Sequence, residues 1–358
     1  MSDPYRLLRP ALFRLPPERA HALAMRVSRL ASGLPPLLDA LTRAGRHEDP
    51  RLAVETFGVR FPNPIGVGAG LDKDADALPI WEAMGFGHVE IGTVTALAQP
   101  GNPRPRAHRL VPDRAIVNAM GFPSVGAVAL AGRLEAWRRR GTWPTAPVGI
   151  NVGKSRVVPI EAAEDDYRAT VRTVAPYADF LVVNVSSPNT PNLRELQDET
   201  RLARLIAAVA EEANGRPVLV KLAPDMPDRE LARLGAAADG WGADGLVLIN
   251  TTVGRAGLRV DPGARGGLSG RPLAARARQA LAVVRPETRL PIVSVGGIDG
   301  PDEAIRRFEA GADLIQVYTG LIYEGPALPG RILAGLSAEL DRRGASDLRE
   351  LRRRDASG

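Results

Sequence analysis

Most of the chain repeats one block: a short apolar run, a loop, and a longer segment with apolar residues three or four positions apart. Short apolar runs bounded by turn residues are typical of buried strands, and the longer spacing is typical of helices. The predicted strands are residues 64–70, 89–95, 147–152, 180–183, 217–222, 245–250, 291–296 and 314–318. The helices predicted to follow them are residues 75–84, 125–139, 161–174, 200–212, 228–238, 273–284, 301–310 and 328–342.

Eight strand–helix units in succession predict an α/β fold, a (β/α)8 TIM barrel. The alternative is an open, doubly wound sheet, which usually has fewer strands and one dominant nucleotide-binding turn. The sequence has no G-x-G-x-x-G segment that opens a helix and no Walker lysine motif. The barrel is therefore the preferred fold.

The first 45 residues precede the repeating blocks and predict a small extension of two short helices, with a loop and boundary marked by Pro35, Pro36 and Gly45. The second helix has a helical apolar stripe, which either packs on the main domain or lies in a membrane interface. The stripe consists of Ala20, Leu23, Ala24, Val27, Leu30 and Ala31. We expect a small hairpin at residues 54–61, a barrel domain over residues 46–343, and a flexible basic tail over residues 344–358.

Composition excludes several classes of protein. The apolar fraction is 44% and the charged fraction 25%, as in soluble globular proteins, and no segment reaches the roughly 18 to 20 apolar residues that a membrane span needs. The N-terminus lacks the continuous apolar core of a signal peptide, so a cytoplasmic location is the default expectation. Without cysteine there is no disulfide, thiolate nucleophile or sulfur-ligated metal.

The basic balance of the chain has two readings. A pI of about 10.1 suggests a nucleic-acid partner. Against this, the net charge is only +6, aromatic residues make up 4% of the chain, and no zinc or RNA-binding motif is present, so we expect no nucleic-acid partner.

Only three of the 47 basic residues are lysines, namely Lys73, Lys154 and Lys221, and each follows or ends a predicted strand. This pattern indicates positions that need a compact charge or a tunable pKa, unless it reflects chance and codon usage.

Polar residues gather where the predicted strands end. In a (β/α)8 barrel the loops that leave the strand C-termini meet at one mouth, which holds the active site. The residues concerned are Lys73, Thr93, Asn151, Asn184–Asn189, Lys221, Asn250, Thr251, Gly296 and Tyr318. We therefore expect a single site built from all eight strands.

Glycine-rich turns follow strands seven and eight, at residues 294–298 and 318–320, with a further run at residues 266–270. Backbone N–H groups of such turns often bind phosphate, because glycine allows close approach. The pattern indicates a phosphorylated cofactor or substrate; the alternative is that the glycines serve tight turns only.

The segment 179–192 combines a buried strand with a polar loop that Pro188 and Pro191 keep extended. Ser187 is the best candidate for a proton acceptor, although Asn, Ser and Pro are also common in ordinary turns. No histidine or carboxylate pair lies at the strand ends, so a hydrolytic triad is not expected. A serine base that acts together with a hydride-accepting cofactor fits these residues better than a hydrolytic triad does.

Many segments, in order, resemble dihydroorotate dehydrogenase, over about residues 4 to 340. The helical extension with residues 17–21, and serine in place of cysteine at the base position, resemble the quinone-dependent class 2 form. The matching segments are residues 70–74, 90–94, 118–122, 149–154, 184–191, 220–225, 250–252, 266–272 and 295–298.

The resemblance implies oxidation of (S)-dihydroorotate to orotate, the fourth step of pyrimidine synthesis, with Ser187 taking the C5 proton while hydride leaves C6 for N5 of FMN. Thr190 is a weaker candidate for relaying that proton. The resemblance places FMN against Ala69, Gly70, Leu71, Asp72, Lys73, Thr93, Asn151, Asn184, Lys221, Ile249, Gly270, Gly297, Tyr318 and Thr319. It places dihydroorotate against Lys73, Asn118, Ala119, Met120, Gly121, Phe122, Asn184, Asn189, Asn250 and Thr251.

The resemblance also implies that a membrane quinone is the final electron acceptor. The N-terminal helices would form its entrance, with His21 and Arg109 at the inner end, and would hold the enzyme peripherally on the cytoplasmic side of the cell membrane. Two positions depart from the family pattern: Ala119 replaces a usual arginine or lysine, and His108 replaces a frequent phenylalanine. The alternatives are a soluble fumarate- or NAD-linked relative, a flavin reductase acting on tRNA dihydrouridine, and a non-enzymatic phosphate-binding barrel.

Overall fold

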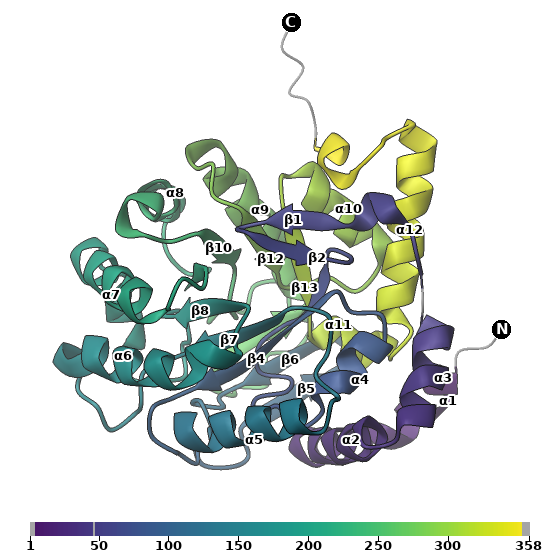
Figure 1. Ribbon diagram of the computed structural model, residues 1–358, viewed down its shortest axis with the longest axis horizontal. Helices are drawn as coiled ribbons and strands as arrows, with labels where there is room; N and C mark the ends of the chain where they lie inside the picture. Colours follow the sequence, from purple (N-terminus) through teal and green to yellow (C-terminus); the bar gives the residue numbers. More distant parts are fainter. Residues whose placement is uncertain (1–3, 46, 353–358) are drawn as a thin grey trace, which may run out of the picture.

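The computed structural model describes residues 4–45 and 47–352. Its centre is a closed, parallel eight-stranded barrel, which confirms the predicted (β/α)8 fold (Figure 1). The strands in chain order are β3 (Ile65–Val67), β4 (His88–Val94), β7 (Val148–Val152), β8 (Phe180–Asn184), β9 (Val218–Leu222), β10 (Gly245–Leu248), β12 (Ile292–Val295) and β13 (Leu314–Val317). Neighbours in sequence pair with one another, and β13 pairs with β3 to close the ring.

Helices cover the outside of the barrel, so both faces of each strand are buried and the strands read as apolar runs without alternation. In α7, for example, Asp198 caps the first turn by accepting from Arg201 N, and Leu202, Leu205 and Val209 form the buried face. The outer helices are α4 (Leu78–Ala83), α5 (Ala127–Arg139), α6 (Ala163–Val174), α7 (Glu199–Glu212), α8 (Asp228–Ala237), α9 (Ala274–Val284), α10 (Pro301–Glu309) and α12 (Leu328–Arg343).

The predicted hairpin, β1 (Val54–Thr56) and β2 (Val59–Phe61), closes the N-terminal end of the barrel. Phe61 is fully buried and packs edge-on against His88 and Phe180. We call this apolar end the floor and the opposite end the mouth. In Figure 1 the hairpin lies at the upper side of the barrel and the α2 and β5 elements lie at the lower side.

Residues 99–123, rich in Pro, Gly and Arg, form a long insertion between β4 and α5. It contains β5 (Ala107–Leu110) and β6 (Ala115–Asn118), and β6 pairs with β11 (Gly267–Gly270) to give a three-stranded antiparallel sheet. Each strand is only four residues long, and the partner of β6 lies about 150 residues further along the chain, so local sequence gives little signal for it. A short extra helix, α11 (Thr319–Glu324), follows the last barrel strand.

The N-terminal extension has three helices instead of the two expected: α1 (Pro4–Leu12), α2 (Pro17–Ser32) and α3 (Pro35–Gly45). Pro35 and Pro36 marked a loop in the sequence, but proline is well tolerated in the first helical turn. Most of the predicted stripe of α2 does not pack on the barrel: Leu23, Val27 and Leu30 are 44%, 57% and 64% exposed, and only Ala31 at its C-terminal end is buried in the core.

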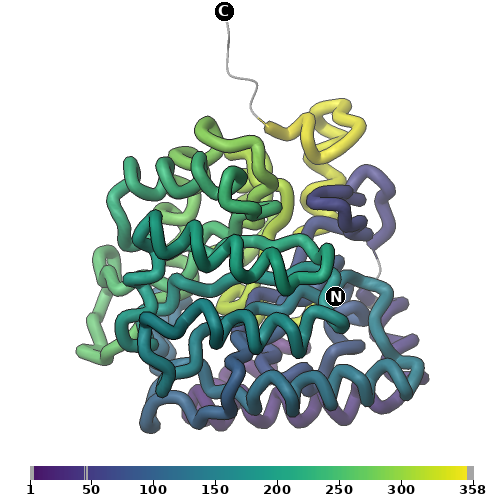
Figure 2. The backbone as a smooth tube through the Cα atoms, turned by 60° about the vertical axis from the view of Figure 1, so that its left-hand side comes forward, coloured from purple at the N-terminus to yellow at the C-terminus, as the bar shows by residue number. Residues whose placement is uncertain are grey.

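The C-terminal tail was expected to be flexible from residue 344, but its first part is docked. Leu348 and Leu351 are buried in a short 3-10 helix, and Arg352 forms an ion pair with Asp313. Arg349 donates to Glu55 O at 3.3 Å, so the tail lies beside the floor hairpin, as Figure 2 shows in yellow and dark purple. The prediction for residues 353–358 lies outside the described residues.

Candidate active site

A cavity of about 300 Å³ opens at the mouth of the barrel, between the strand C-termini, the β5–β6–β11 sheet and α2. Lys73, Ser187 and Lys221 all line it, although they lie on three well-separated segments of the chain. The expectation that distant residues meet at one mouth is therefore confirmed. The other predicted residues that line the cavity are His21, Ala69, Gly70, Thr93, Asn118, Met120, Gly121, Phe122, Asn184, Asn189, Ile249, Asn250, Thr251, Gly270, Gly297, Tyr318 and Thr319.

Of the residues that the resemblance places at the ligands or in proton transfer, six do not line the cavity: Leu71, Asp72, Ala119, Asn151, Thr190 and Arg109. Asp72 is fully buried and accepts from Asp76 N, Ala77 N and Trp81 Nε1, and burial raises its pKa to about 6. It organises the start of α4 behind the cavity wall.

A buried carboxylate, Glu90, is the centre of the polar network beneath the cavity. Its two oxygens accept from Asn151 Nδ2 at 2.6 Å and Gln316 Nε2 at 2.7 Å, and Lys221 Nζ lies 3.4 Å away. Glu90 is completely buried, and a buried anion needs such partners. Lys221 is thus held at the cavity wall by an ion pair from below.

The amides above Glu90 form one continuous chain of hydrogen bonds. Asn184 Nδ2 donates to Thr93 Oγ1 at 2.9 Å and to Asn151 Oδ1 at 3.0 Å. Asn250 Nδ2 donates to Ser186 Oγ at 2.9 Å, and Ser186 Oγ donates to Asn184 Oδ1 at 2.9 Å. Asn151 therefore lies behind the cavity wall and acts indirectly, because it fixes the orientation of Thr93 and Asn184, which line the cavity.

Ser187 is 5% exposed, and its Oγ accepts from Asn189 N at 3.2 Å. No histidine or carboxylate hydrogen-bonds to it within residues 4–45 and 47–352, so a serine triad is not assembled there. The side chain of Asn189 donates to Asn118 O at 3.0 Å, which joins the serine loop to the Asn118–Phe122 segment. Thr190 Oγ1 is buried and has no hydrogen-bond partner in the described structure. It therefore keeps the capacity to form one more hydrogen bond.

Lys73 lies at the cavity wall next to Tyr318. Lys73 Nζ donates to Gly70 O at 2.5 Å, and Tyr318 Oη donates to the same carbonyl at 3.1 Å. Burial lowers the pKa of Lys73 to about 8 and raises that of Tyr318 to about 12. At neutral pH Lys73 is a cation able to pair with an anionic ligand, and Tyr318 is a neutral hydrogen-bond donor.

Glycines contribute to the cavity wall after both β12 and β13, at Gly296, Gly297 and Gly320. Gly297 has φ +80°, and a Cβ there would lie 2.5 Å from the backbone of Ala274, so only glycine fits. The carbonyl of Gly296 is held by Arg307 Nη2 at 2.6 Å. The fully buried Arg307 also pairs with Glu303 at 2.8 Å, which fixes this turn from behind.

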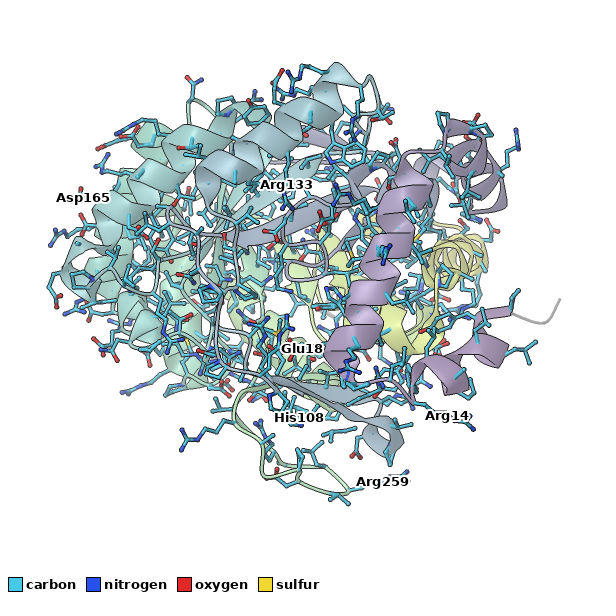
Figure 3. All side chains as sticks on the ribbon, turned by 90° about the horizontal axis from the view of Figure 1, so that it is seen from below. Arg14, Glu18, His108, Arg133, Asp165 and Arg259 are labelled. Carbon is cyan, nitrogen blue, oxygen red and sulfur yellow. The ribbon has the colours of Figure 1, made fainter. Side chains whose placement is uncertain are left out.

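Helix α2 covers one side of the cavity and brings His21 to its wall. Glu18, in the first turn, accepts from Arg106 Nε at 2.9 Å and from Arg106 N at 3.1 Å, and Arg104 Nε lies 3.1 Å away. Figure 3 shows Glu18 at the end of α2 that lies toward the strand carrying His108. Burial, with a contribution from Lys73, lowers the pKa of His21 to about 4, so His21 is neutral at pH 7.

The side chain of Arg109 contacts the N-terminal extension and does not line the cavity. Its guanidinium lies 4.2 Å from the centre of the Phe13 ring and donates to Phe13 O at 3.1 Å, so it fastens the turn between α1 and α2. Its predicted place in a quinone pocket with His21 stays a prediction. Lys154 is also structural, since it donates to Ser155 O at 3.0 Å and to Val158 O.

Sequence reasoning missed four residues around the cavity: Glu90, Gln316, Glu18 and Arg106. Glu90 and Gln316 are single polar residues inside apolar strand runs, a signal that would have marked them. Glu18 and Arg106 lie in polar segments that give no such signal, and only the docking of α2 brings them together. Within the described residues, no group of three or more His, Asp or Glu side chains could hold a metal ion.

The comparisons with known proteins agree with this geometry. Residues 51–340 match the family model described as dihydroorotate dehydrogenase. Two similar curated proteins are both named dihydroorotate dehydrogenase (quinone). One, from Thermus thermophilus, is 48% identical and covers 96% of this chain and 99% of its own. The other, from Clavibacter sepedonicus, is 50% identical and covers 92% and 97%.

Among solved structures, the crystal structure of DHODH from Eimeria tenella in complex with ferulenol is similar, with a TM-score of 0.87 and 33% identity. The match covers 97% of this chain and 99% of that one. The ligand-free form from the same organism gives a TM-score of 0.80 at 34% identity.

Proposed function

This chain belongs to the dihydroorotate dehydrogenase family, enzymes that oxidise dihydroorotate in pyrimidine biosynthesis, and we propose that it does so with FMN as hydride acceptor and a membrane quinone as final electron acceptor. The observation that carries the proposal is the meeting of Lys73, Ser187 and Lys221 around one amide-lined cavity. Two cations, one serine without a triad, and several asparagines suit an anionic pyrimidine and a redox cofactor better than they suit hydrolysis.

The cavity wall suits FMN on two counts. Gly270 and Gly297 line the cavity, in glycine-rich turns of the kind whose backbone N–H groups bind phosphate. Gln316 also lines the cavity, and its Oε1 is buried without a hydrogen-bond partner in the described structure, so it is a candidate acceptor for a ligand N–H. When bound, FMN supplies the hydride acceptor that no protein side chain can provide.

The residues on the other side of the cavity suit dihydroorotate. Asn118, Asn189 and Asn250 offer both donors and acceptors to the ring, and the Lys73 cation can pair with the carboxylate. Ser187 Oγ accepts the C5 proton as hydride leaves C6. The Ser187 hydroxyl passes its own proton on, with Thr190 as the candidate relay, and the N–H of Asn189 stabilises the negative charge that develops on Oγ as that proton leaves.

The visible spectrum of the purified protein tests the function directly. We expect a yellow protein whose flavin absorption is bleached by dihydroorotate without air and restored by a quinone. A colourless preparation with no FMN uptake would indicate a non-enzymatic barrel. Bleaching that fumarate or NAD reverses, and quinone does not, would indicate the soluble relative. Turnover of tRNA without dihydroorotate oxidation would indicate the RNA-modifying reductase.

The extension suits a membrane surface that supplies quinone. Leu7, Leu8, Leu23, Val27 and Leu30 are each at least 44% exposed on α1 and α2, and arginines flank them. An exposed apolar face with basic neighbours lies well in a bilayer interface. None of the described helices is long and apolar enough to cross a bilayer, and we propose peripheral attachment to the cytoplasmic side of the cell membrane.

Vesicle flotation tests the attachment. The triple variant Leu23→Ser, Val27→Ser, Leu30→Ser should lose binding to vesicles and keep flavin reduction by dihydroorotate. Val128 and Val157 are 77% and 79% exposed outside the extension, and their Ser variants are the matched control that should still float. Equal flotation of both sets would remove the extension from membrane contact.

A further inference from the structure

The loop that follows β8 carries Ser187, and we call it the catalytic loop. Arg194 lies in the 3-10 helix Leu193–Gln197, directly after this loop. Its Nε donates to Ser186 O at 3.0 Å, the carbonyl that directly precedes Ser187. Its Nη2 donates to Thr251 O at 3.3 Å. One guanidinium therefore holds the backbone of two cavity-lining loops, those that follow β8 and β10.

The third arm of Arg194 reaches a third loop. Arg194 Nη1 lies 2.8 Å from Asp225 Oδ2, in the loop after β9. Asp225 also accepts from Val253 N at 3.1 Å and from the Thr252 hydroxyl, so it binds the β10 loop a second time. Strands β8, β9 and β10 are neighbours in the barrel, and the Arg194–Asp225 pair ties all three of their ends together.

We propose that Arg194, anchored by Asp225, is a positioning residue that sets Ser187 against the substrate-binding residues Asn250 and Thr251. The proposal rests on the function proposed above. Arg194 itself does not line the cavity, so it acts through backbone carbonyls and touches no reacting atom. Because a misplacement of about 1 Å can cost about 10²-fold in rate, a pair that fixes two loops at once has leverage over proton transfer.

The shape of arginine is part of the proposal. A planar guanidinium directs separate N–H groups to three acceptors, whereas a lysine ammonium is a point charge on a flexible stem and cannot reproduce the fork. The pair lies at the edge of an open groove outside the cavity, and the other charged groups of that groove are Glu195, Asp198, Arg201 and Glu230. Arg201 pairs with Glu195 at 3.5 Å, and within the described part of the chain its side chain forms no hydrogen bond or ion pair with Ser187, Thr251 or Asp225, so it is a matched control.

Stopped-flow measurements without air test the proposal on FMN-loaded protein. In Arg194→Lys we expect the limiting rate of flavin reduction by dihydroorotate to fall about 10- to 100-fold. Reoxidation of the chemically reduced flavin by quinone should stay within about twofold of wild type, because Ser187 takes no part in it. Asp225→Asn should lower the same reductive rate, and the double variant should lose less than the product of the two single losses. Arg201→Lys should leave both half-reactions unchanged.

Three results would overturn the proposal: a normal reductive rate in Arg194→Lys, equal losses in both half-reactions, or equal losses in Arg201→Lys. Thermal melts of each variant separate positioning from loss of fold, because a merely structural role would lower the melting temperature and leave the split between half-reactions unmoved. If Arg194→Lys does not fold, Asp225→Asn alone tests the proposal: its rate of flavin reduction should fall while its rate of reoxidation by quinone stays unchanged. A wild-type flavin that dihydroorotate does not reduce would instead refute the proposed function.

Discussion

His88 and Glu90 are two residues apart on β4, and both side chains enter the barrel interior, His88 near the floor and Glu90 nearer the mouth. His88 lies among Phe61 and Phe180, and neither of its ring nitrogens has a hydrogen-bond partner in the described structure. Glu90, by contrast, has two amide donors and a lysine. One strand thus passes, within two residues, from an apolar cluster to a hydrogen-bonded carboxylate.

This difference between His88 and Glu90 reflects the separate roles of the two ends of a (β/α)8 barrel. Residues at the floor close the structure and contribute packing, and residues at the mouth carry the chemistry. Substitutions of residues that line the cavity should therefore alter ligand chemistry first. Substitutions of the groups buried beneath the cavity and at the floor should alter stability, and those at the floor should leave the site intact. The predictions below test this division, beginning with the largest expected effect.

Ser187→Ala should keep bound FMN and lower the rate of flavin reduction by at least about 10²-fold, the usual loss for an acid–base group. Anaerobic stopped-flow absorbance measures it, with quinone reoxidation as the internal control. Near wild-type reduction at neutral pH would remove Ser187 from the mechanism.

Glu90→Gln should destabilise the protein by about 3 kcal/mol, because it leaves the nearly buried Lys221 charge without its carboxylate. Urea unfolding at pH 7 measures the change. Glu199→Gln breaks the exposed pair with Arg233 and is the matched control, with a much smaller expected loss. Equal losses would mean that Glu90 does not compensate Lys221.

Gly66→Ala at the floor should cost about 1–3 kcal/mol of stability without changing the flavin chemistry, because the new Cβ would lie 2.0 Å from His88 Nε2. The double variant with His88→Ala should be more stable than the sum of the single losses predicts, since the ring that collides is gone. Gly132→Ala, in α5 with open space around it, is the control and should stabilise slightly.

The last prediction concerns the pH dependence of stability, a gradual effect spread over several pH units. Burial lowers the pKa of His88 from 6.5 to about 3 in the folded protein. Between these values the unfolded chain binds a proton that the folded chain does not, so His88 makes stability fall as pH drops below 6.5. His88→Phe should flatten that fall by at most about 1.4 kcal/mol per pH unit.

Unfolding curves between pH 4 and 7 check this slope. The pKa of His21 is also lowered by burial, to about 4, so the His88 variant should keep part of the slope. An unchanged slope would mean that the His88 ring is protonated or solvated in the folded protein.

The sequence by itself determined the barrel and most of its mouth. Strand runs such as Val218–Leu222 are apolar because both faces are buried, and that pattern is readable without a structure. The polar residues that end the strands, Lys73, Asn184 and Lys221 among them, could be assigned to one site because parallel barrel strands all point their C-termini the same way.

Tertiary structure decided what depends on contacts between distant segments. The pairing of β6 with β11, the ion pair of Glu18 with Arg106, and the Arg194–Asp225 tie join residues whose local sequence carries no trace of the partner. The exposed stripe of α2 shows the same limit, because a helical period fixes which residues share a face but not what that face meets.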